Sequence, residues 1–184
     1  ISSNSAMIRK PPLNEEFISG LNFLEEIYKK PPPPIRGQEG LQYTSERYLN
    51  NLLGSPPLDI CEVSELKHIS FTEKQKSFFY NTLAKEYPKS SILLSGHFFY
   101  PENGYMSWHT NNKAPGLRVY LSYTEYDDGS YFSYKSGNKV TKDMDSKGWT
   151  LREFDINKEN LLWHSVFAYK PRISLGFRVI KNLL

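Results

Sequence analysis

The chain has 184 residues, of which 39% are hydrophobic, 23% are charged and 15% are aromatic. This length suits one domain with its own hydrophobic core, and no apolar run reaches the roughly 18 residues of a membrane span. The formal net charge of +3 is too small to indicate a nucleic-acid-binding surface by itself. The single cysteine, Cys61, excludes an internal disulfide and is typical of a reducing compartment, so we expect a cytoplasmic protein.

The chain is expected to combine a helical support and a β-rich core within one structural domain. Residues 1–6 (ISSNSA) precede the first methionine, Met7, and have the composition of a vector-derived tail, so the fold prediction leaves them out. Residues 7–90 contain the helical patterns, whereas residues 91–184 contain short strand patterns. The sequence therefore predicts a mixed α+β protein, mainly β, in which N-terminal helices support the β core.

The first predicted helix covers residues 13–30. Its apolar residues recur at helical spacing behind a suitable N-cap residue, Asn14. Four prolines at positions 31–34 end the pattern, because proline has no amide proton and disfavours helix in the residue before it. Residues 37–66 carry no clear periodic pattern and predict no element.

The second predicted helix ends at Pro88, where the pattern changes from helix to strand. Thr72 and Gln75 have the spacing of a capping box, which predicts a helix over residues 73–87. Beyond Pro88, short β-branched or aromatic segments alternate with Asn, Gly, Asp and Pro. Seven strands so close together predict an antiparallel sandwich or barrel. These segments are residues 92–100, 117–124, 130–135, 140–142, 149–154, 161–167 and 172–180.

Two of the four histidines are candidates for a metal site. His109 ends a strand-like run and opens a polar turn, while His164 lies among apolar strand residues, eight positions before Arg172. Ser174 follows two residues after Arg172 and therefore lies on the same face of a strand. One histidine in a strand is usually structural, so neither alone indicates a metal site, but the two together with the arginine say more.

The segments FYPENGYMSWHTN, RVYLSYTEYDDGSYF and LWHSVFAYKPRISLGFRV resemble the core of the Fe(II)/2-oxoglutarate-dependent oxygenases. In that family a double-stranded β-helix, or cupin-like jelly roll, carries a His-x-Asp/Glu motif at the end of one strand. A distal histidine lies on another strand, and an Arg or Lys follows it, often as Arg-x-Ser. His109, His164, Arg172 and Ser174 match this pattern in type, order and spacing over about residues 92–180.

The resemblance implies an iron-dependent hydroxylase. Fe(II) would be held by His109, His164 and the residue at position 111, leaving adjacent positions for 2-oxoglutarate and dioxygen. Arg172 and Ser174 would bind the distal carboxylate of the 2-oxoglutarate cosubstrate. The segment around Tyr100 is similar to that of the prolyl-hydroxylase-like branch, where a tyrosine can bond the cosubstrate.

The sequence departs from the family pattern at Asn111, which occupies the position of the carboxylate ligand. An amide oxygen is neutral, so such a site should hold Fe(II) less tightly. Three alternatives stay open at this point: Asn111 is a weak third ligand, a carboxylate comes from Glu125, Asp127 or Asp128, or the site is degenerate. Family halogenases carry a small residue here to admit halide, and asparagine fills that space.

The sequence leaves the substrate and the oligomeric state undetermined. The substrate could be a protein side chain, a nucleobase or a small molecule: the Tyr100 segment favours a prolyl-hydroxylase-like enzyme, and the slight excess of basic residues favours nucleic acid. The alternative from a different functional class is a non-catalytic jelly-roll protein that binds a ligand or has a structural role. No feature of the sequence indicates a membrane partner.

Overall fold

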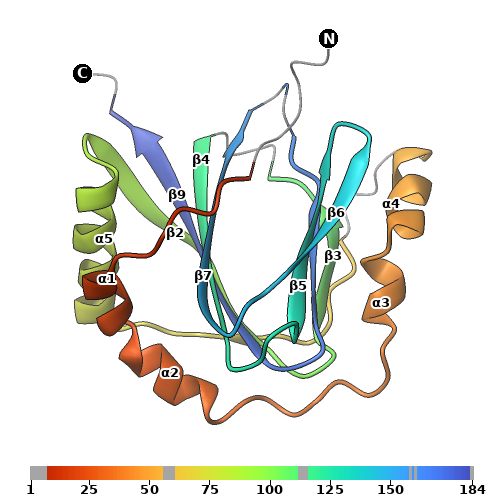
Figure 1. Cartoon of the computed structure of the whole chain (residues 1–184), viewed down its shortest axis with the longest axis horizontal. Coiled ribbons are helices and arrows are strands. Elements are labelled where there is room, and N and C mark those ends of the chain that lie inside the picture. Colours follow the sequence, from red (N-terminus) through yellow and green to blue (C-terminus); the bar gives the residue numbers. More distant parts are fainter. Residues whose placement is uncertain (1–7, 56–60, 112–115, 158, 160, 183–184) are drawn as a thin grey trace.

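The computed structural model describes residues 8–55, 61–111, 116–157, 159 and 161–182. Two antiparallel β-sheets face each other as a jelly roll, and helices cover the outer side of both (Figure 1). This confirms the predicted class: an α+β protein, mainly β, with supporting helices from the N-terminal half. The described chain has no helix with both the length and the apolar character needed to cross a membrane.

The larger sheet has five strands in the order β1-β2-β9-β4-β7, and the smaller has four in the order β3-β8-β5-β6. The first, in that order, consists of β1 (Lys67–His68), β2 (Ser90–Tyr100), β9 (Arg172–Lys181), β4 (Gly116–Thr124) and β7 (Gly148–Ile156). The second consists of β3 (Tyr105–His109), β8 (His164–Ala168), β5 (Ser130–Ser136) and β6 (Lys139–Met144). Strands that follow one another in the sequence thus often lie in opposite sheets, as a double-stranded β-helix requires.

Side-chain alternation gives the larger sheet one apolar and one mixed face. On β4 and β9, residues such as Leu121 and Leu175 belong to a core cluster with the helices. The residues between them, including Tyr120 and Ser174, face the smaller sheet and line a cavity. The outer face therefore stabilises the fold, and the inner face is free to carry polar groups.

Three helices pack on the outer face of the larger sheet: α1 (Glu15–Ser19), α2 (Asn22–Tyr28) and α5 (Glu73–Glu86) (Figure 1). The last confirms the second predicted helix, and the capping box between Thr72 and Gln75 is formed. The single helix predicted over residues 13–30 is wrong, because the chain breaks it at Gly20. A Cβ there would clash with the ring of Phe78 on α5, so the close approach of that ring requires glycine.

Two further helices, α3 (Gly40–Tyr43) and α4 (Glu46–Leu53), cover the smaller sheet. They lie in the region for which no element was predicted. Trp108 on β3 anchors them, since its indole Nε1 donates a 2.8 Å hydrogen bond to the carbonyl of Ser45, the N-cap of α4. The residue that follows Trp108 is His109, so this contact fixes the strand end that carries the first predicted metal ligand.

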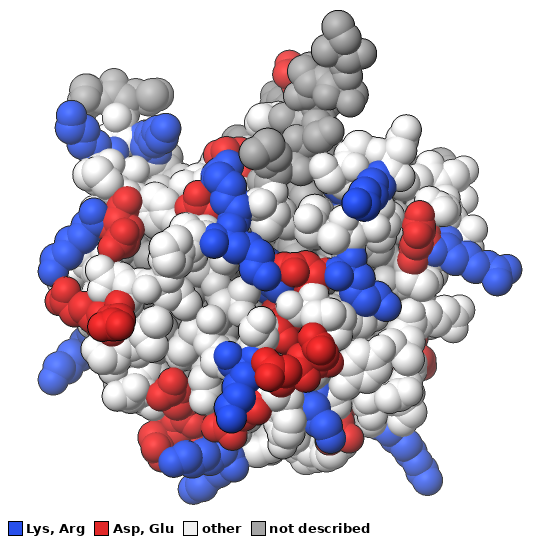
Figure 2. Space-filling model, viewed as in Figure 1, with Lys and Arg blue, Asp and Glu red and all other residues white. Residues whose placement is uncertain are grey.

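Charged side chains of both signs are interspersed over the face of the molecule that Figure 2 shows. Lys and Arg side chains lie beside Asp and Glu side chains on this face. A surface that binds nucleic acid usually gathers its basic residues into a patch or stripe. The charges on this face therefore give no support to a nucleic-acid partner.

Candidate metal and carboxylate site

A cavity of about 250 Å³ lies between the two sheets. None of the described residues that line it is acidic. All six residues predicted for the site contribute to its wall, although they come from four strands and one loop: Tyr100, His109, Asn111, His164, Arg172 and Ser174.

The two histidines face each other from adjacent strands of the smaller sheet. His109 and His164 are register partners across β3 and β8, and their ring centroids are 4.1 Å apart. The Nδ1 of His109 lies 2.8 Å from the carbonyl oxygen of Ser107, and the Nδ1 of His164 lies 2.9 Å from that of Leu162. Because a carbonyl oxygen only accepts, each Nδ1 carries the proton and each Nε2 keeps a lone pair.

Both imidazoles are favoured in the neutral form that binds metals. Burial lowers the pKa of His109, although its bond to the Ser107 carbonyl opposes the shift. Burial lowers the pKa of His164 further, and the neighbouring His109 adds to this effect. His164 is only 2% exposed, and its Nε2 is a buried polar atom without a hydrogen-bond partner among the described residues. A buried lone pair of this kind is costly unless a ligand satisfies it.

Asn111 lies beside the two histidines in the cavity wall. Its Nδ2 donates a 2.8 Å hydrogen bond to the hydroxyl of Tyr120 on β4. The ring of Tyr120 is 5.9 Å from that of His164, so the amide is held at the same end of the cavity as the histidines. The bond uses the nitrogen of the amide and not Oδ1, which is the atom that could bind a metal.

The structure excludes the alternative that a carboxylate from the turn after β4 completes the site. Glu125, Asp127 and Asp128 are exposed and do not line the cavity. The Glu125 backbone N–H donates to the hydroxyl of Tyr28, and an Asp127 oxygen accepts from the Lys147 N–H. No group of three His, Cys, Asp or Glu residues suited to a metal occurs in the described part of the chain. The turn follows the far end of β4, at the end of the barrel where Arg172 lies.

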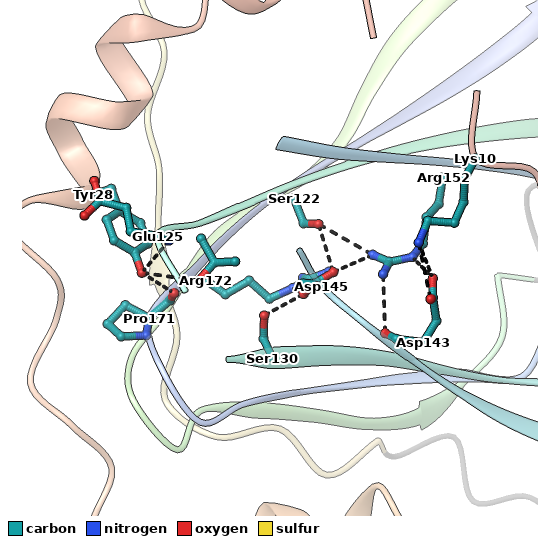
Figure 3. Close-up of polar contacts among 11 residues, drawn as sticks. Lys10, Tyr28, Ser122, Glu125, Ser130, Asp143, Asp145, Arg152, Pro171 and Arg172 are labelled. Atoms are coloured by element: carbon teal, nitrogen blue, oxygen red, sulfur yellow. Dashed lines mark hydrogen bonds and ion pairs between the residues drawn. The ribbon is translucent and has the colours of Figure 1, made fainter. Parts of the chain in front are cut away.

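Arg172 occupies the opposite end of the cavity from the histidine pair. Its Nε donates a 2.7 Å hydrogen bond to Oδ2 of Asp145, in the segment that follows β6 (Figure 3). The residue is 2% exposed, and its Nη1 is buried without a hydrogen-bond partner among the described residues. One edge of the guanidinium is therefore committed to Asp145, while Nη1 is available for a further acceptor.

Asp145 is the centre of a buried network that the sequence did not indicate. Besides Arg172, it binds Nη1 of Arg152 at 2.8 Å and the hydroxyls of Ser130 at 2.6 Å and Ser122 at 3.2 Å (Figure 3). Burial alone would raise the pKa of this carboxyl, but Arg172 and Arg152 outweigh it and hold the pKa well below its ordinary value. Asp145 is thus ionised throughout the neutral range.

The depressed pKa of Asp145 predicts a loss of stability in acid. Such a carboxyl contributes stability that is fully present above its unfolded value of about 4 and that decreases as pH falls toward the folded value. We expect the free energy of unfolding from urea titrations to fall between about pH 5 and pH 2. In the Asp145→Asn variant the free energy of unfolding should change less with pH over this range. An equal pH dependence in the two proteins would contradict the prediction.

Tyr100 and Ser174 complete the arginine end. The Tyr100 ring is buried, with its centroid 5.7 Å from the Arg172 guanidinium carbon, which is within the range of a cation–π contact. Burial raises the pKa of its phenol, so the hydroxyl stays protonated and can donate a hydrogen bond. Ser174 lies two residues along β9 from Arg172 and on the same face, as the sequence predicted.

The chain resembles known proteins in fold and not in sequence. No protein-family model matches it, and no curated protein has a significantly similar sequence. Among solved structures, it resembles a prolyl hydroxylase from Trichoplax adhaerens in complex with a hypoxia inducible factor oxygen degradation domain peptide fragment. The TM-score is 0.55 at 10% identity, over 98% of this chain and 85% of that one. A Pseudomonas putida prolyl-4-hydroxylase gives a TM-score of 0.56 at 9% identity, over 98% of this chain and 94% of that one. At these identities the similarity shows the fold alone.

Proposed function

We propose that the protein is an Fe(II)- and 2-oxoglutarate-dependent oxygenase that acts as a hydroxylase. The observation that carries the proposal is the cavity itself. At one end, the half-buried His109 and the buried His164 have protonated Nδ1 atoms and keep their Nε2 lone pairs, and at the other, a buried arginine has an N–H without a partner among the described residues. A metal ion would bind the imidazole lone pairs, and a carboxylate would accept a hydrogen bond from the arginine N–H.

The donor set fits a divalent metal of the iron type. Imidazole nitrogen is a common ligand of Fe(II), and the backbone carbonyls of Ser107 and Leu162 orient both rings as outer-shell groups do in metal sites. Oδ1 of Asn111 would be the third protein ligand. Bound there, Fe(II) would supply the positions at which dioxygen is activated.

The arginine end fits the distal carboxylate of 2-oxoglutarate. Tyr120, beside His164, is paired in register with Gly176, and Arg172 lies four residues along β9, roughly 13 Å away at the usual rise of a strand. An extended arginine side chain and a five-carbon dicarboxylate can bridge this distance together. Nη1 of Arg172 would bind the carboxylate, with Ser174 and Tyr100 as the nearby hydroxyl donors.

Arg172 belongs to a network of ion pairs in which the buried charges are matched. Arg152 and Arg172 pair with Asp143 and Asp145, and Lys10 binds Asp143 at the exposed edge of the network. A bound carboxylate would be held by Nη1 of Arg172, which has no hydrogen-bond partner among the described residues. Burial of that pair would make the interaction stronger than the same contact in water.

The remaining wall of the cavity limits the substrate. Apolar side chains such as Phe98, Phe132 and Val166 would exclude water from the reacting groups. The volume of about 250 Å³ is below the ~300–1,000 Å³ of typical small-ligand pockets. We therefore propose that the substrate inserts one small group, either as a small molecule or as a single side chain or base of a polymer.

Iron binding and cosubstrate turnover test the proposal without knowledge of the substrate. Purified protein should bind Fe(II) in anaerobic equilibrium titrations, bind 2-oxoglutarate in its presence, and form succinate slowly when air is admitted. Absence of both iron and 2-oxoglutarate binding would overturn the proposal. Proteins with His109 or His164 replaced by alanine are the negative controls, because each lacks one imidazole.

Replacing Arg172 by methionine is expected to weaken 2-oxoglutarate binding. Loss of one buried charge-assisted hydrogen bond corresponds to about 1.5–3 kcal/mol, which is a rise of about tenfold or more in the dissociation constant. The measurement is calorimetric titration of the metal-loaded protein. Arg178→Met is the matched control, since this half-buried arginine lies six residues along the same strand. Equal affinity in the Arg172→Met protein would remove the arginine from the cosubstrate site.

A second candidate function is a jelly-roll protein that binds a dicarboxylate without oxidising a substrate. Asn111 favours it, because three neutral protein ligands should hold a metal less tightly than two histidines and a carboxylate. The same assays separate the two functions. Binding of 2-oxoglutarate without any succinate formation would favour the binding protein.

A further inference from the structure

An asparagine ligand has a requirement that a carboxylate ligand does not have. Both oxygens of a carboxylate can bind a metal, but only one end of an amide can, because the NH₂ group has no lone pair to give. An amide free to rotate by half a turn would present its nitrogen for part of the time. Asn111 therefore needs a partner that fixes which end of its amide faces the histidine pair.

Tyr120 has the contacts of such a partner. Its hydroxyl accepts the 2.8 Å hydrogen bond from Nδ2 of Asn111, which binds the nitrogen end of the amide. The phenol oxygen can accept this bond and still donate its own proton elsewhere. Because this bond uses Nδ2, the end of the amide that it leaves unbound is Oδ1, and Asn111 lines the same cavity as His109 and His164.

The Tyr120 ring is itself held in place. It makes an edge-to-face contact with Phe154, with ring centroids 4.9 Å apart, and lies 5.9 Å from the ring of His164. On its other side is Gly176, where an added Cβ would approach Cε1 of Tyr120 to 3.1 Å. The ring is thus enclosed by a phenylalanine and bare backbone, and its hydroxyl has a fixed position.

We propose that Tyr120 is a positioning residue for metal binding: it holds the amide of Asn111 so that Oδ1, and not Nδ2, faces the metal. The inference rests on the proposed function only in requiring a metal at the histidine pair. It accounts for an asparagine in this position, since the amide becomes a defined oxygen donor through a neighbouring side chain rather than through its own charge.

The test is a double-mutant cycle on metal affinity, with Co(II) as the probe. Co(II) binding is followed by its visible absorption and by competition with a chelator, so neither 2-oxoglutarate nor turnover is needed. Tyr120→Phe should weaken Co(II) binding about tenfold, in line with the effect of removing other outer-shell groups. In an Asn111→Asp background, the same change should alter affinity by less than about twofold, because a carboxylate needs no orientation of this kind.

Tyr134→Phe is the matched control. Tyr134 lies on β5 and is the register partner of His164, but it does not line the cavity. Removing its hydroxyl should therefore leave the Co(II) affinity unchanged. Thermal unfolding of each variant checks that the fold is retained. A general structural role for Tyr120 would weaken metal binding equally in the natural and the Asn111→Asp backgrounds, and that result would overturn the inference.

The remaining outcomes separate this inference from the proposed function. Unchanged Co(II) affinity in Tyr120→Phe would reject the positioning role and leave the oxygenase proposal intact. Co(II) binding by Asn111→Asp but not by the natural sequence would mean that Asn111 is not a ligand, which also overturns the inference. If the double-mutant cycle gives the expected Co(II) affinities but the protein does not bind 2-oxoglutarate, the positioning role of Tyr120 is supported and the oxygenase proposal is rejected.

Discussion

Replacing Asp145 by asparagine is expected to lower the free energy of unfolding by about 3–5 kcal/mol, the usual cost of removing one partner from a buried ion pair. Asp145 is 1% exposed and accepts from two buried arginines, so its loss leaves Arg172 and Arg152 close together without their shared anion. Asparagine keeps the size of the side chain, which limits any cavity effect. Urea denaturation at pH 7 measures the change.

Asp143 provides the control for this prediction, because it binds the same Arg152 from the edge of the network. Its side chain is 24% exposed, and its bonds to Arg152 and Lys10 are open to solvent on one side. Asp143→Asn should therefore cost less than Asp145→Asn, about 1–2 kcal/mol, because Asp143 is partly solvated and Arg152 keeps its ion pair with Asp145. A loss for Asp145→Asn no greater than that for Asp143→Asn would show that the network does not stabilise the fold.

The sequence indicated which residues meet in the cavity better than it indicated the contacts that support them. His109, His164, Arg172 and Ser174 were singled out because they match the pattern of the oxygenases that the sequence resembles in type, order and spacing, and strand alternation places Arg172 and Ser174 on one face. Strand-rich patterning after Pro88 likewise predicted the β core. These features depend on local sequence, and the fold preserves them.

Contacts between residues distant in sequence were missed. Asp145 follows a short strand in a polar segment that reads as an ordinary turn, and only the folded barrel brings it to Arg172. The contact that requires glycine at position 20 involves Phe78, 58 residues later, which no pattern over residues 13–30 could reveal. Helix α4 had one signal in the sequence, a serine that suits an N-cap: in the structure Ser45 accepts from the backbone N–H of Tyr48.

Replacing Asn111 by aspartate is expected to tighten Fe(II) binding by about a hundredfold, at the upper end of the effects seen when groups around a metal are changed. The change keeps the shape of the side chain and adds one negative charge to a cavity whose described wall contains no acid. Tyr120 can still bond the new side chain, because its hydroxyl can donate as well as accept. Anaerobic competition with a chelator measures the affinity, and an unchanged value would exclude position 111 as a ligand.

The same variant also decides between the two candidate functions. If the natural protein and Asn111→Asp both form succinate from 2-oxoglutarate, the amide is a working ligand and the protein is an oxygenase with a neutral set of protein ligands. If only Asn111→Asp does so, the natural protein keeps the cavity, the histidines and Arg172 but lacks the charge needed to retain iron, which favours the binding protein.

Asn112→Asp is a suitable control, because it adds the same charge at the next position in the sequence without placing it at the carboxylate position of the His-x-Asp/Glu pattern. An equal gain in Fe(II) affinity and succinate formation in Asn112→Asp would mean that the added negative charge, rather than a ligand at position 111, explains the result.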